Sequence, residues 1–125
     1  VWVDMFFTFM NEGKLDPKTR LILPDPGMPG QPMYFVIPKK AGNAEMAKKF
    51  VEYVTSPAVQ AKEIVQRFNW YPGIDGSYIK DFVPADVFNK IYRDVTPEDL
   101  QKKGLSFPLA QYYDAMLESY EKWIK

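Results

Sequence analysis

The residues best suited to contact a ligand are Trp70 and Tyr71, neighbours in a segment rich in turn-forming residues. Pro-Gly and Asp-Gly pairs follow them, so the sequence predicts a loop over residues 69–77. Aromatic rings offer a large contact area at low entropic cost and stack on sugars and flat heterocycles. A stiff loop that presents two rings would therefore form a binding edge. The alternative is that both rings pack over the helices beneath them.

Three further side chains are candidate ligand contacts. Asp4 ends a predicted strand, and in open α/β sheets ligands bind beyond the carboxyl ends of strands. A helix-capping role explains Asp4 equally well. Tyr34 flanks a connector over residues 24–32, where ligands lodge between two packed bodies, and hinge packing is its alternative. Tyr112, with Tyr113, lies on the apolar stripe of the last predicted helix, a pattern more typical of core residues.

Enzymatic chemistry has little support in the composition. The chain contains no His and no Cys, which removes the commonest general base, thiolate nucleophiles and soft metal ligands. Its acidic residues lie among lysines at the spacing of solvated helix faces, and no phosphate-binding or nucleophile motif occurs. We therefore predict a protein that is not an enzyme and that uses no cofactor or metal. A carboxylate hydrolase using, for example, Asp4 with Asp25 stays as a rival.

Charge and hydropathy limit the partners. The 16 basic and 16 acidic residues are interspersed and give a formal net charge of zero, so nucleic acid is not an expected partner. No apolar run reaches the roughly 18 to 20 residues that a membrane span needs. The 125 residues are 46% hydrophobic, enough for one domain with a real core. An aromatic content of 16% suggests that some rings lie on a surface that something else covers.

The chain is organised around residues 30–57. Residues 33–37 form an apolar run rich in Tyr, Phe, Val and Ile, which predicts a buried strand that ends at a proline. Asn43 is the predicted N-cap of a helix that ends at residue 55 or 56 and whose apolar stripe faces a sheet. A Ser-Pro pair then starts a second amphipathic helix over residues 57–68.

The remaining elements are shorter or simpler. For the β-branched and aromatic opening we predict a strand over residues 1–5 and a helix over 6–12 closed by Gly13; a single helix over 3–12 is the competing interpretation. Residues 21–23 predict a second short strand, and residues 24–32, dense in Pro and Gly, an extended connector. The other expected helices run over residues 84–92, from Thr96-Pro97 to Gly104, and over residues 108–125.

Several segments, taken in order, resemble the C-terminal part of the extracellular solute-binding proteins of ABC importers. They are VWVDM with the helix after it, LILPDPG, MYFVIPKKAGN, AEMAKKFVEYVTSP, PAVQAKEI, the loop with WYPG and the Tyr-rich last helix. The most specific is VIPKKAGNAEMAKKFVEYVTSPAVQ, which is similar to the strand, turn and helices of that family. Individually these motifs are weak, but their order covers nearly the whole chain.

The resemblance implies an α/β fold: the C-terminal portion of a two-lobed periplasmic-binding-protein (type II) fold, mostly helical here with a few short strands. Residues 1–29 would be the end of the second lobe and the crossover, and residues 30–125 the hinge strand and the helices returning to the first lobe. Such proteins capture a small solute, for example a sugar, polyamine or thiamine-like molecule, and close over it by hinge motion. They deliver it to ABC permease subunits and are periplasmic or extracellular, some of them lipid-anchored.

The same resemblance points to Asp4, Tyr34, Trp70, Tyr71 and Tyr112 as ligand contacts. A complete member needs roughly twice this length or more, because it contains two domain-sized lobes. The chain also opens inside an apolar run, so we expect a piece of a longer protein that by itself self-associates or exposes apolar surface. The main alternative function is a stand-alone helical domain whose exposed aromatic stripe binds a partner protein.

Overall fold

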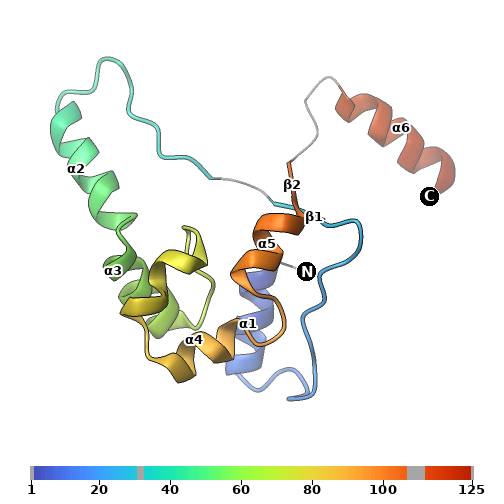
Figure 1. The fold of residues 1–125 in the computed structure, drawn as a ribbon. Coiled ribbons are helices and arrows are strands. Elements are labelled where there is room, and N and C mark those ends of the chain that lie inside the picture. Colours follow the sequence, from blue (N-terminus) through green and yellow to red (C-terminus); the bar gives the residue numbers. More distant parts are fainter. Residues whose placement is uncertain (1, 31–32, 107–111, 125) are drawn as a thin grey trace.

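The computed structural model describes residues 2–30, 33–106 and 112–124, and these are mostly helical (Figure 1). The helices are α1 (Val3–Asn11), α2 (Ala44–Val54), α3 (Pro57–Val59), the π-helix η1 (Gln60–Gln66), the 3-10 helix η2 (Gly76–Phe82), α4 (Ala85–Ile91), α5 (Pro97–Lys103) and α6 (Tyr113–Trp123). Strands β1 (Met28–Pro29) and β2 (Gly104–Leu105) pair in parallel, with Met28 opposite Gly104. The expectation of a mostly helical chain with a few short strands is therefore confirmed at this coarse level.

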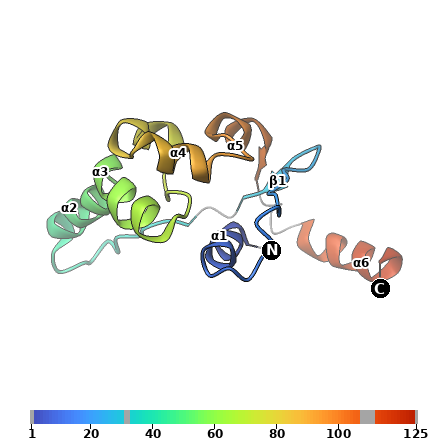
Figure 2. The same cartoon turned by 90° about the horizontal axis from the view of Figure 1, so that it is seen from below.

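The core lies in the middle of the molecule, where α1, η1, η2 and α4 meet. Ala61 and Val65, four residues apart on η1, are fully buried, as the apolar spacing of residues 57–68 predicts. The other buried members of the cluster are Phe6, Phe7, Ile79, Val83, Ile91 and Tyr92. Helices α2 and α6 lie on opposite sides of this body in both views (Figures 1 and 2).

Local capping explains where the predicted helices begin. The side chain of Asn43 accepts a hydrogen bond from the main-chain N of Met46 at 3.1 Å, and α2 ends with Thr55 as its C-cap, as predicted. Thr96 and Asp99 form a capping box that starts α5. These helix boundaries follow from side chains within one turn, so the sequence alone determines them.

The predicted strand over residues 1–5 is wrong. Residues 3–5 belong to α1, so the competing single helix is confirmed over Val3–Asn11, and residue 1 lies outside the described residues. Asp4 and Thr8 are four residues apart and so share one face of this helix, and the hydroxyl of Thr8 donates to the main-chain O of Asp4 at 2.9 Å. Gly13 follows the helix with φ 68°, the left-handed conformation that suits a terminating glycine.

The predicted strands over residues 21–23 and 33–37 are also wrong for the part of the chain that the structure describes. Residues 33–36 are extended, but their side chains are between 61% and 93% exposed rather than buried. A strand needs a neighbouring strand to satisfy its main-chain groups, and the described residues offer none to these segments. Within the predicted connector, residues 28–29 pair with β2, and residues 31–32 lie outside the described residues.

The expected sheet beneath α2 is absent from the described residues. No residue of α2 is buried, and Met46, Phe50 and Tyr53 are each more than half exposed. The last helix is confirmed from Tyr113 onward, whereas residues 108–111 and 125 of that prediction lie outside the described residues. Both amphipathic helices therefore form from their own sequence pattern, but neither buries its apolar stripe.

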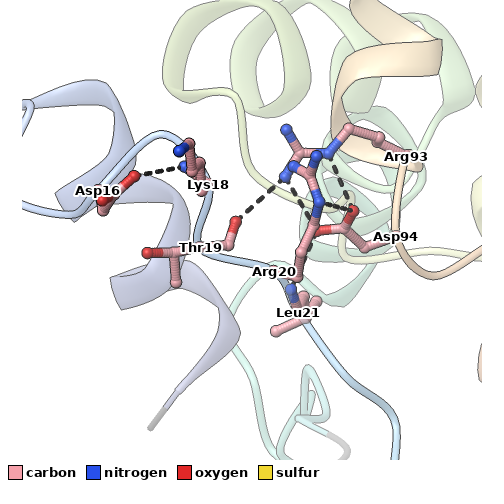
Figure 3. A network of polar contacts seen from close by, with 7 residues as sticks. All are labelled: Asp16, Lys18, Thr19, Arg20, Leu21, Arg93 and Asp94. Carbon is pink, nitrogen blue, oxygen red and sulfur yellow. Dashed lines mark hydrogen bonds and ion pairs between the residues drawn. The ribbon is translucent and has the colours of Figure 1, made fainter.

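Asp94 connects the segment after α1 to the turn between α4 and α5 (Figure 3). Its carboxylate accepts hydrogen bonds from the main-chain N of Leu21 at 3.0 Å and from Nε of Arg93 at 2.9 Å. Arg20 lies 3.8 Å away, and Arg93 also donates to the carbonyl O of Thr19 at 3.4 Å. The side chain of Asp94 is only 12% exposed. The hydrogen bond from Arg93, with that from Leu21, holds the pKa of Asp94 below its ordinary value.

We expect Asp94→Asn to lower the free energy of unfolding at neutral pH by about 1 to 2 kcal/mol, because it removes the charge from these hydrogen bonds. The folded-state pKa is lowered, so the carboxylate stabilises the fold above its ordinary pKa of 3.8. That contribution disappears as the pH falls through the folded-state pKa. Urea unfolding at several pH values measures the difference in the free energy of unfolding between the wild type and the variant. This difference should vanish in acid. Asp81→Asn, at an exposed position, is the matched control and should change little.

Candidate functional site

Tyr71 is held inside an aromatic cluster. Its ring stacks on Tyr92, with centroids 4.9 Å apart and an interplanar angle of 11°, and meets the ring of Phe7 edge-on at 5.0 Å. Its hydroxyl donates to the carbonyl O of Val95 at 3.3 Å. Burial, followed by the charge of Asp94, raises the pKa of Tyr71 to about 12. The ring of Tyr71 therefore contacts α1 and the end of α4, and its hydroxyl bonds to the loop before α5.

Gly76 makes room for this cluster. A Cβ atom at position 76 would lie 2.6 Å from Cζ of Tyr92, a separation that would force the ring to move. Burial also raises the pKa of Tyr92, with Tyr71 as the next cause. The two stacked phenols and the glycine beside them therefore form one tightly packed unit.

Trp70 connects the same loop to α1. Its Nε1 donates to the hydroxyl of Thr8 at 3.1 Å, and its ring stacks on Phe68 with centroids 5.1 Å apart. Thr8 in turn donates to the main-chain O of Asp4. Trp70 is half-buried, so it retains some exposed ring area. In this arrangement, both loop aromatics pack over the helices next to them.

Asp4 stabilises its own helix in the described structure. It lies in the first turn of α1, where a negative charge interacts favourably with the helix dipole, and its Oδ1 accepts from the main-chain N of Met5 at 2.9 Å. The carboxylate is exposed, whereas Phe6 and Phe7 of the same helix are buried in the core. Hydrogen bonds connect Asp4 to Trp70 through the hydroxyl of Thr8. This connection uses the main-chain O of Asp4 rather than its carboxylate.

Tyr34 and Tyr112 form a second, exposed group. Tyr34 is 80% exposed in the extended segment before α2, and Tyr112 is 54% exposed at the N-cap position of α6. Among the described residues, neither ring stacks on Trp70 or Tyr71. The structure thus brings Asp4, Trp70 and Tyr71 together around α1, and it leaves the other two candidate contacts facing solvent.

A cleft that the sequence did not indicate lies between α1, the segment after it, β1 and α5. It has a volume of about 300 Å³, at the lower limit for small-molecule sites. Its lining is almost entirely apolar: Val3, Leu21, Ile22, Leu23, Met28, Pro29, Gly30, Val95, Leu100 and Gly104. The cleft therefore suits apolar groups but lacks the polar side chains that orient a soluble ligand. The only part of the cleft that the sequence could indicate was the apolar run at residues 21–23. The rest of the cleft depends on the pairing of β1 with β2, which joins residues far apart in the sequence.

Over residues 2–30, 33–106 and 112–124, no group of three or more acidic side chains could hold a metal ion. Within the same residues, no helix is long and apolar enough to cross a bilayer. Comparison with protein-family models, curated proteins and solved structures gave no match to the chain.

We expect the fold to lose stability in alkali through Tyr71. Its folded-state pKa of about 12 exceeds the ordinary 10.0, so the neutral phenol stabilises the fold below pH 10.0 and this contribution is lost as the pH rises toward 12. Denaturant unfolding between these pH values should show a fall in the free energy of unfolding, and this fall should be smaller in Tyr71→Phe. The variant also lacks the hydrogen bond to Val95, which lowers its stability equally at all pH values. Tyr78→Phe, at a 66% exposed position, should leave the alkaline fall unchanged. An identical fall in the Tyr71 variant would contradict the expectation.

Proposed function

We propose that this chain is part of the substrate-binding component of an ABC transporter, which captures a small solute in an interlobe cleft and delivers it to a membrane permease. The observation that carries the proposal is the order of elements over residues 33–59. An extended apolar segment leads through a turn into α2, capped by Asn43, and a Ser-Pro pair then opens α3. This is the order in which the family resemblance places a hinge strand and the helices that return to the first lobe.

The exposed apolar surface of the same region supports the proposal. Phe35 meets Phe50 edge-on at 6.4 Å, so the extended segment and α2 share one apolar face. Both side chains are more than half exposed. In the proposed arrangement this face packs on strands of the first lobe, which accounts for a strand-like sequence that has no neighbouring strand within the part of the chain that the structure describes.

Binding in the proposed protein works by affinity and domain closure. Tyr34 and Tyr112 have exposed rings that are available to stack on a solute, whereas Trp70 and Tyr71 hold the loop in place. Aromatic contacts of this kind suit a sugar, a polyamine or a ring-bearing cation such as thiamine. The protein would act in the periplasm or outside the cell, with or without a lipid anchor, and its macromolecular partners would be permease subunits.

A stand-alone helical interaction domain is the second candidate function. The observation that favours it is the apolar face of α6, on which Tyr120 and Trp123 are 53% and 74% exposed. Such a face matches the pattern by which an amphipathic helix docks into a groove. Solute binding and protein binding are separable, because only the first requires the exposed tyrosines outside α6.

Thermal-shift measurements on the complete gene product, with sugars, polyamines and thiamine, test the proposal. A solute that binds only the folded protein raises its melting temperature by mass action. We expect Tyr34→Ala and Tyr112→Ala each to weaken that binding about tenfold, the loss of one stacking ring, without changing the melting temperature of the free protein. Trp70→Ala should instead lower the melting temperature of the free protein, since it removes buried contacts.

Tyr78→Ala is the matched control, because Tyr78 is as exposed as these tyrosines but lies on η2. If no solute in the panel shifts the melting temperature, the transport proposal loses its support. If instead a protein ligand binds and Trp123→Ala abolishes that binding, the interaction domain is favoured.

A further inference from the structure

We draw no further inference here: the strongest candidate, the apolar cleft between α1, residues 21–23, β1 and α5, has an almost entirely apolar lining, and nothing in the described residues shows what covers it.

Discussion

The stacking of Tyr71 on Tyr92 is the contact on which the body of the molecule depends. It joins the loop after η1 to the end of α4, and through Phe7 it also holds α1. The elements it connects are too short to be stable alone, since isolated helices of this length are marginal in water. Their stability comes from burying a small set of aromatic and aliphatic side chains together.

This core is confined to the central elements, so the outer elements bury little apolar surface. Asp94 adds a second fastening, because it ties the segment after α1 to the α4–α5 corner through hydrogen bonds rather than through apolar burial. Beyond these two points, residues 33–37, α2 and α6 contribute no buried residue to the described structure. This exposed apolar surface underlies the transport proposal, because an apolar face that is not covered within the described chain calls for a covering surface.

Helices proved easier to predict than strands, for a physical reason. The cap at Asn43, the capping box at Thr96 and the spacing of Ala61 and Val65 act within one or two turns of chain, so they are visible in the sequence. The apolar run at residues 33–37 has the composition of a strand, but strand formation requires a partner that composition cannot supply. The opening residues have strand-like composition too, yet the polar spacing that includes Asp4 and Thr8 agrees with the helix that forms.

For the candidate site, the sequence by itself determined which side chains have suitable chemistry and that Trp70 and Tyr71 lie on a loop. Only the tertiary structure decided that Tyr71 stacks on Tyr92, that Trp70 bonds to Thr8, and that Tyr34 and Tyr112 remain exposed. The pairing of β1 with β2, and the apolar cleft beside it, also arise only in three dimensions. The physical reason is that capping and periodicity are local interactions, whereas burial depends on which distant segments meet.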